Sequence, residues 1–266
     1  MISSTVNPQV KQVSALGKKA KYRKETGLFV VEGPRMFAEL PKERIERVYV
    51  TERFQKEGRQ NEKLKKIPHV EVVTEEVLKA MSDTQTPQGV LALAKQYEYR
   101  LEDILKIPGK AHLMILETLQ DPGNLGTILR AGEGAGITGI IMNQDTADIY
   151  NPKVIRSTMG SVFRVPFVYV DDLKDAIKTL KQSGIYLYGA HLKGAADYDQ
   201  EDYTKPMGFL IGNEARGLSD EISSMADACV KIPMAGAVES LNAAVASSVL
   251  MYEAARQRRT FSVKKS

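Results

Sequence analysis

Short apolar runs alternate with helical patterns along the first 95 residues of the chain. Four runs rich in β-branched residues predict strands, at residues 28–31, 48–50, 70–73 and 89–94. A short helix is expected at 34–40, where a proline lies near the start, and another after Thr74, a favourable N-cap followed by two glutamates. These elements predict a small β/α unit of the size of a domain.

The same alternation is stronger in the second half. Six further apolar runs predict strands, at residues 113–116, 139–142, 167–170, 185–190, 209–211 and 228–232. Helices are expected at residues 124–136, 152–159, 173–182 and 241–258, the last with Ser240 as its N-cap. Strand–helix alternation is typical of a mostly parallel sheet covered on both faces. A polar segment separates the two halves, so we expect two domains, 1–105 and 106–266.

Composition places the chain among ordinary globular proteins. It has 266 residues, 43% of them hydrophobic and 26% charged, which is enough for a sizeable core and excludes overall disorder. No stretch reaches 18 consecutive apolar residues and the N-terminus lacks an apolar signal region, so we expect no membrane partner. The single cysteine, Cys229, cannot form an internal disulfide, which favours a reducing, cytoplasmic location.

Positive charge is concentrated near the N-terminus. The net charge is only +4, but residues 1–109 carry 20 Lys and Arg against 15 Asp and Glu. Five basic residues close together are candidates for binding nucleic acid: Lys18, Lys19, Lys21, Arg23 and Lys24. The same residues also fit a solvated helix face, and the sequence alone does not choose between the two.

Several familiar site patterns are absent or fail. Residues 134–139 match G-x-G-x-x-G, but a predicted helix precedes them and a strand follows, which is the reverse of a dinucleotide-binding turn. A helix C-cap explains them better. The histidines, His69, His112 and His191, lack metal-ligand spacing, and neither a P-loop nor a G-x-S-x-G elbow occurs. We therefore expect no metal, and a P-loop NTPase or an α/β-hydrolase is disfavoured.

Three segments carry the candidate chemistry. The first, D-P-G-N-L-G-T-I-L-R at 121–130, follows a predicted strand and opens a helix, where open α/β sheets bind ligands. The second, F-L-I-G-N-E-A-R-G-L-S at 209–219, places a glycine and a carboxylate directly after a buried strand. The third, at 232–246, is a loop of small residues that can offer backbone groups to an adenine-like ring, followed by Ser-Leu-Asn at a helix start. Each taken singly also fits an ordinary turn between a strand and a helix.

Taken together and in this order, the segments closely resemble the three motifs of the SpoU (TrmH-type) RNA ribose 2′-O-methyltransferases, a family of the SPOUT class. The resemblance covers nearly the whole chain, because the N-terminal part looks like the family's small substrate-binding domain. It implies an α/β fold with a C-terminal knotted parallel-sheet SPOUT methyltransferase domain and a small N-terminal α/β domain that binds RNA. It also implies a homodimer with the site near the subunit interface.

The resemblance implies S-adenosylmethionine as cofactor and assigns roles to individual residues. The adenosine pocket would be lined, largely through backbone atoms, by Gly212, Ile232 and Leu241, with Ala190 as a further candidate. The family's active-site arginine falls on Arg130, and the accompanying polar positions fall on Asn124, Glu214, Ser240 and Asn242. The third motif departs from the usual S-L-N-V-S-V-A, since this chain reads S-L-N-A-A-V-A and loses a helix serine.

The implied reaction needs few protein groups, because the methyl sulfonium is already activated. The enzyme must align a ribose 2′-OH with the methyl carbon and help to remove one proton. Arg130 would act either as the general base that the family proposal names or, since arginine stays protonated, as a holder of phosphate or of the developing alkoxide. Two alternatives stay open: a non-catalytic RNA-binding ribosome-assembly factor and a SPOUT enzyme that methylates a base. The N-terminal extension favours rRNA over tRNA as the substrate.

Overall fold

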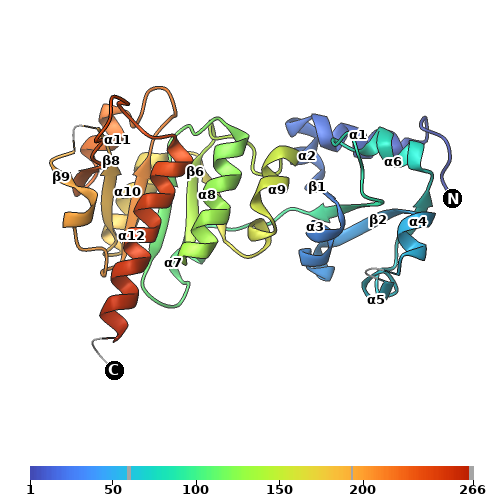
Figure 1. The fold of residues 1–266 in the computed structure, drawn as a ribbon, viewed down its shortest axis with the longest axis horizontal. Helices are drawn as coiled ribbons and strands as arrows, with labels where there is room; N and C mark the ends of the chain where they lie inside the picture. Colours follow the sequence, from blue (N-terminus) through green and yellow to red (C-terminus); the bar gives the residue numbers. More distant parts are fainter. Residues whose placement is uncertain (59–60, 193, 264–266) are drawn as a thin grey trace. The chain divides into compact units, whose positions relative to one another are not determined.

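The computed structural model describes residues 1–58, 61–192 and 194–263, which form two compact units (Figure 1). Unit 1 comprises Met1–Tyr97 and Asp148–Phe163, and unit 2 comprises Glu98–Ala147 and Arg164–Ser266. The sequence did not indicate that residues 148–163 pack with the N-terminal part of the chain. The domain boundary between residues 105 and 106 stays a prediction.

Unit 1 is built on a four-stranded sheet in the order β1-β4-β2-β3. Its strands are β1 (Leu28–Glu32), β2 (Ile45–Thr51), β3 (Val70–Val73) and β4 (Val90–Lys95). β4 runs antiparallel to β1 and β2, whereas β2 and β3 are parallel. All four predicted strands are therefore present, with somewhat different ends.

The helices of unit 1 are mostly short. They are α1 (Pro8–Lys18), α2 (Ala20–Thr26), α3 (Pro34–Glu39), α4 (Glu52–Lys56), α5 (Asn61–Leu64), α6 (Glu75–Met81) and α9 (Pro152–Thr158), with 3-10 turns at Lys42–Arg44 and Ser161–Phe163. Thr74 caps α6, as predicted, because its hydroxyl oxygen accepts a hydrogen bond from the Val77 N–H.

Helix α1 was not among the predicted elements. Asn7 caps its N-terminus by accepting a hydrogen bond from a backbone N–H of the first turn. Val10, Val13 and Leu16 recur every three residues and lie in the same core cluster as side chains of α6 and the sheet. The opposite face of the helix, which carries Lys11 and Lys18, is exposed.

Unit 2 contains a seven-stranded sheet in the order β7-β6-β5-β10-β8-β11-β9. The strands are β5 (His112–Leu116), β6 (Gly139–Asn143), β7 (Phe167–Val170), β8 (Tyr186–Ala190), β9 (Ala196–Asp197), β10 (Met207–Ile211) and β11 (Ala228–Lys231). Every neighbouring pair is parallel, as predicted. The chain leaves β5 on one side for β6 and returns on the other side at β10, so the strand order reverses between β5 and β10.

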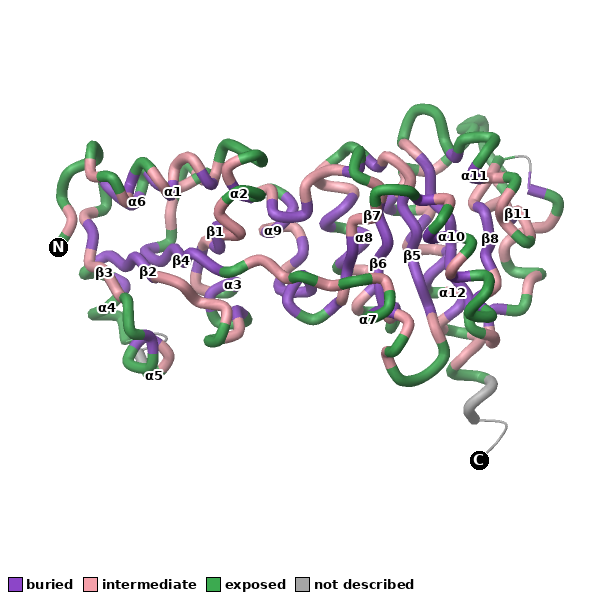
Figure 2. Tube along the Cα trace, turned by 180° about the vertical axis from the view of Figure 1, so that it is seen from behind, coloured by how far each residue is buried: buried purple, intermediate pink, exposed green. Residues whose placement is uncertain are grey.

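Helices cover both faces of this sheet, and the strands between them are buried (Figures 1 and 2). The helices are α7 (Leu101–Leu105), α8 (Pro122–Ala135), α10 (Leu173–Gln182), α11 (Asp220–Ser224) and α12 (Ala243–Val263), with a 3-10 turn at Tyr198–Gln200. α8 and α12 lie side by side on one face. Side chains of α7, α10 and α11 join a core cluster on the other. No helix among the described residues is both long and apolar enough to cross a membrane.

The ends of two helices bear on the sequence predictions. α12 begins at Ala243, and Asn242 rather than Ser240 caps it, because the Asn242 Oδ1 accepts hydrogen bonds from the N–H groups of Ala244 (2.9 Å) and Val245 (3.3 Å). The prediction of Ser240 as N-cap was therefore wrong. α8 ends at Gly136 in the left-handed conformation, which confirms the interpretation of the 134–139 glycines as a C-cap.

Candidate active site

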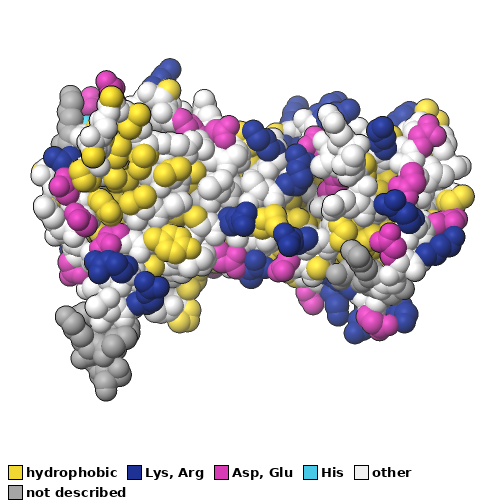
Figure 3. Space-filling model, in the orientation of Figure 1, with side chains coloured by type: hydrophobic (Ala, Val, Ile, Leu, Met, Phe, Trp, Pro, Cys, Tyr) yellow, Lys and Arg dark blue, Asp and Glu magenta, His cyan; other side chains and the backbone are white. Residues whose placement is uncertain are grey.

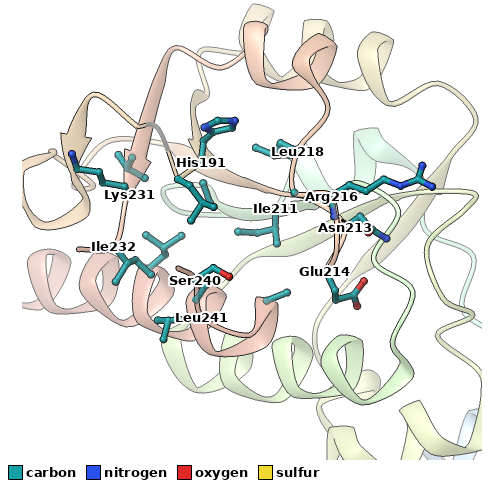
Figure 4. Close-up of a pocket in the computed structure, with 18 of the residues that line it drawn as sticks. His191, Ile211, Asn213, Glu214, Arg216, Leu218, Lys231, Ile232, Ser240 and Leu241 are labelled. Carbon is teal, nitrogen blue, oxygen red and sulfur yellow. Dashed lines mark hydrogen bonds between the residues drawn. The ribbon is translucent and has the colours of Figure 1, made fainter. Parts of the chain in front are cut away.

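A cavity of about 380 Å³ lies in unit 2, at the carboxyl ends of β8, β10 and β11 (Figure 4). The loops that follow these strands and the segment leading into α12 form its walls. Ligands of open parallel sheets bind at this edge, beside the point where the strand order reverses. The volume is that of a small-molecule site.

All four residues assigned to the cofactor line this cavity: Ala190, Gly212, Ile232 and Leu241. A Cβ at position 212 would lie 2.0 Å from the Gly217 carbonyl carbon and 2.1 Å from the Leu218 nitrogen. Only glycine therefore fits where the chain leaves β10. Sequence reasoning missed other lining side chains, among them His191, Asn213 and Met234.

The loop after β10 folds back on itself. The backbones of Asn213 and Gly217 exchange two hydrogen bonds, N–H to O, of 3.1 and 2.8 Å. The Asn213 Oδ1 also accepts from the N–H groups of Ala215 and Arg216. Gly217 has a φ of +70°, which glycine adopts without steric cost. The loop is thus shaped by its own hydrogen bonds and presents its backbone to the cavity.

Glu214 lines the cavity, but both of its carboxylate oxygens accept hydrogen bonds from the segment 120–124 at the start of α8. Oε1 accepts from the Asp121 N–H (2.9 Å) and from the Asn124 side-chain amide (3.1 Å), and Oε2 accepts from the Gln120 N–H (3.1 Å). Burial alone raises the pKa of Glu214, but these hydrogen bonds outweigh it and lower the pKa. The side chain is therefore an ionised anchor for the start of α8.

Asn124 links Glu214 to the third motif. Its Nδ2 donates to Glu214, and its Oδ1 accepts from the Asn242 Nδ2 at 3.0 Å. Asn242 in turn caps α12. The three motifs, far apart in the sequence, are thus joined side chain to side chain, and three of the five predicted polar site residues lie together.

The other two predicted polar residues stand apart from this chain of bonds. Ser240 is exposed and lines the cavity. Arg130 lies two turns into α8, beside the buried stripe of Leu125, Ile128 and Leu129, and its side chain is exposed. It does not line the cavity, and no described residue forms a hydrogen bond or an ion pair with it.

The predicted RNA-binding residues divide into two groups. Four are exposed on α1 and α2 or at the junction between them: Lys18, Lys19, Lys21 and Lys24. Two of them line a shallow groove of about 300 Å³ along α1. Arg23 is different, because only 3% of the residue is exposed. Its guanidinium donates to the Asp148 carboxylate at 2.6 and 2.8 Å and to the Leu16 carbonyl at 2.6 Å. Arg23 is a core residue of unit 1, and its assignment to RNA was wrong.

The described residues contain no group of three or more His, Cys, Asp or Glu side chains arranged to hold a metal ion. His112 is buried in β5, and neither of its ring nitrogens has a partner. Burial, with a smaller contribution from Arg258, lowers its pKa to about 3, so the imidazole is neutral. It belongs to the core and not to the cavity.

A parallel sheet with reversed strand order and a cavity built by the second and third motifs beside the first fit the class that the motifs resemble, the SpoU-type RNA methyltransferases. Comparisons with known proteins agree. Residues 111–252 match the SpoU rRNA Methylase family, and residues 7–92 match the MRM3-like substrate binding domain. The chain is 30% identical over 253 residues to the 23S rRNA (guanosine(2553)-2'-O)-methyltransferase RlmP of Bacillus subtilis, a match that covers 94% of this chain and 97% of that protein. The chain belongs to the SpoU rRNA methylase family.

Solved structures show the same relationship. The SpoU methyltransferase AviRb from Streptomyces viridochromogenes, in complex with AdoMet, is 29% identical with a TM-score of 0.86, covering 96% of this chain and 99% of that one. An AdoMet-bound rRNA methyltransferase from Sinorhizobium meliloti is 33% identical with a TM-score of 0.84, covering 96% and 97%. The predicted two-part α/β fold class with its parallel-sheet methyltransferase domain, the enzyme class of RNA methyltransferase and the methyl donor S-adenosylmethionine are confirmed, whereas the knot stays a prediction.

Proposed function

We propose that this enzyme transfers the methyl group of S-adenosylmethionine to a ribose 2′-OH of ribosomal RNA. The observation that carries the proposal is the chain of side-chain bonds from Glu214 through Asn124 to Asn242, which ties the cavity to the helix that bears Arg130. The named activity of the Bacillus subtilis relative, 2'-O-methylation of 23S rRNA, supports this choice over methylation of a base.

Unit 1 favours rRNA over tRNA as the substrate. The rRNA methyltransferase from Sinorhizobium meliloti matches 96% of this chain. By contrast, the TrmH/SpoU tRNA modifying enzyme from A. aeolicus matches only 61% of it, with a TM-score of 0.53. A second N-terminal unit is thus shared with an rRNA enzyme and gives this chain an additional surface for a larger RNA.

The cavity residues fit the cofactor. Gly212 lets the loop after β10 fold back against Gly217 and Leu218 beside the cavity, and Ile232 and Leu241 offer apolar contacts to a bound ring. S-adenosylmethionine supplies a methyl group activated by its sulfonium. What this chain must add is alignment of the 2′-OH and compensation of the charge that develops on it.

We assign this electrostatic role to Arg130. A guanidinium stays protonated in proteins, which disfavours it as a general base but suits it to hold the neighbouring phosphate or the developing alkoxide. Its lack of a partner among the described residues leaves its donors available for RNA. Glu214, with both oxygens occupied, is assigned to positioning, as is Asn242. Ser240, which lines the cavity, and Asn124, at the start of α8, are assigned to contacts near the ribose.

The exposed lysines of α1 and α2 supply the phosphate contacts of unit 1 in this proposal. Their side chains are exposed, whereas that of Arg23 is buried, and Lys18 and Lys19 border the groove along α1. Their replacement by alanine, with the salt dependence of RNA binding as the measurement, tests this assignment.

The proposal extends to assembly. We propose a homodimer formed through the face of α8 and α12, where Val245 and Tyr252 are 48% and 52% exposed. Figure 3 shows hydrophobic side chains gathered on this side, around the loop that precedes α12. Light scattering coupled to gel filtration measures the mass directly, and a monomer at micromolar concentration would contradict it. We also propose that the chain has the family's C-terminal knot and a domain boundary at residues 105/106. In this proposal the enzyme needs no metal and is cytoplasmic.

Methylation mapping decides the function. In rRNA from cells that lack this protein, one ribose 2′-O-methyl group should disappear, and the purified enzyme should restore it in the presence of S-adenosylmethionine and EDTA. Loss of a base methyl group instead would favour the base-methylating alternative. An unchanged rRNA and tRNA methylation pattern would favour a non-catalytic ribosome-assembly factor.

A further inference from the structure

Thr118, which directly follows β5 and Glu117, has a backbone conformation that its side chain disfavours. Its φ is +55°, and only one other non-glycine residue in the described part of the chain, Met159, has a positive φ. A β-branched residue in the left-handed region is strained, because its side chain crowds the backbone. Such strain persists only where the surroundings hold the residue in place, and it gathers at functional sites.

Two asparagines, neither of them among the predicted site residues, hold Thr118 by its N–H, its hydroxyl and its carbonyl group. The Asn143 Oδ1 accepts from the Thr118 N–H at 2.8 Å, and the Asn143 Nδ2 donates to the Thr118 hydroxyl at 2.8 Å. The Asn213 Nδ2 donates to the Thr118 carbonyl at 2.9 Å. Thr146 in turn holds the Asn143 side chain, because its hydroxyl donates to the Asn143 Oδ1 at 2.8 Å.

Thr118 opens the short connection that leads into α8. Three residues further on, Asp121 caps that helix by accepting from the Asn124 N–H at 2.8 Å. Asn213, which holds the Thr118 carbonyl, lines the cavity and follows Gly212. The turn at Thr118 therefore links the start of α8, the helix of Asn124 and Arg130, to the loop after β10.

We propose that Asn143 is a positioning residue for methyl transfer. By keeping Thr118 in its strained turn, it sets the start of α8 against the cofactor loop, and so places Arg130 for the reaction. This inference rests on the proposed function. Asn143 itself lies at the end of β6, is not among the residues that line the cavity, and acts only through Thr118.

Two substitutions at Asn143 separate positioning from stability. Asn143→Leu removes both hydrogen bonds between residue 143 and Thr118 and leaves the one from Asn213. Asn143→Asp keeps an acceptor for the Thr118 N–H, and its second oxygen accepts from the Thr118 hydroxyl when that group rotates. We expect the kcat of Asn143→Leu to fall at least tenfold with the KM for S-adenosylmethionine changed less than threefold. Asn143→Asp should recover kcat to within threefold of the wild type.

All rates are measured per folded enzyme on an rRNA fragment, well below the melting temperature. Gln144→Ala, an exposed neighbour, serves as the matched control and should behave as the wild type. If Asn143→Leu does not fold, Thr118→Val, which removes only the hydroxyl, should lower kcat threefold or more. An unchanged kcat in whichever of these two variants folds overturns the positioning role and leaves the proposed function intact. An inactive wild type overturns both.

Discussion

Gly212 offers a sharp test of the cavity, because its surroundings leave no space for a side chain. In Gly212→Ala the new Cβ would meet the Gly217 carbonyl carbon at 2.0 Å and the Leu218 nitrogen at 2.1 Å. These are backbone atoms, which cannot rotate away as the end of a flexible side chain can. The loop after β10 must therefore move away from the strand by about an ångström or more.

The size of the effect follows from what that movement breaks. The two backbone hydrogen bonds between Asn213 and Gly217 close the loop at 3.1 and 2.8 Å. Each such bond contributes about 1 kcal/mol net, so losing the bound shape of the loop costs about 2 kcal/mol. Since a factor of ten corresponds to about 1.4 kcal/mol, the affinity for S-adenosylmethionine should fall by about 30-fold.

Titration calorimetry with S-adenosylmethionine measures this loss directly, with a melting curve to confirm that the variant is folded. Gly236→Ala is the matched control, because a Cβ there meets no atom within 4 Å although the residue lies in the third motif. The control should bind as the wild type does. If Gly212→Ala binds S-adenosylmethionine within threefold of the wild type, the cofactor does not use this loop and the assignment of the cavity is wrong.

Three other substitutions test the remaining assignments. Arg130→Ala should abolish single-turnover methyl transfer while cofactor affinity stays within about threefold; more than about a tenth of the wild-type rate, or about 1.4 kcal/mol in the barrier, would contradict its role. Replacing the exposed Lys18, Lys19 and Lys21 by alanine should make the log–log salt dependence of RNA binding shallower by about two units. An unchanged slope would show that these lysines are only a solvated helix face. Arg23→Ala should destabilise unit 1 by about 3 kcal/mol in a denaturant titration, because it leaves a partly buried carboxylate without its partner. An equal effect of the exposed Lys24→Ala would refute this, since we expect that change to stay within about 0.5 kcal/mol.

Local sequence pattern by itself determined most of the strands and the longer helices of unit 2, but not helix α1 or several short helices. The apolar runs predicted the strands of both sheets, apart from the two-residue β9, because a strand in a buried sheet must be apolar along its length. The resemblance of the three motifs to the SpoU family assigned Gly212, Ile232 and Leu241 to the cofactor, and all three line one cavity at the carboxyl edge of the sheet.

Only the tertiary structure decided the roles that depend on residues far apart in the sequence. Arg23 looks like its lysine neighbours, yet it is buried because Asp148, 125 positions away, folds back beside it. Glu214 looks like a free carboxylate, yet its two oxygens accept hydrogen bonds from the backbone N–H groups of Gln120 and Asp121.

Thr118 and Asn143 showed no signal at all in the sequence. The structural role of each residue depends on the other, because the strained turn at Thr118 persists only where the Asn143 side chain, from another strand, holds it by hydrogen bonds. Periodicity reports which residues face a core, because that depends on neighbours three or four positions away. It cannot report which polar groups meet across a sheet, since the order of the strands in space is set when the whole domain packs.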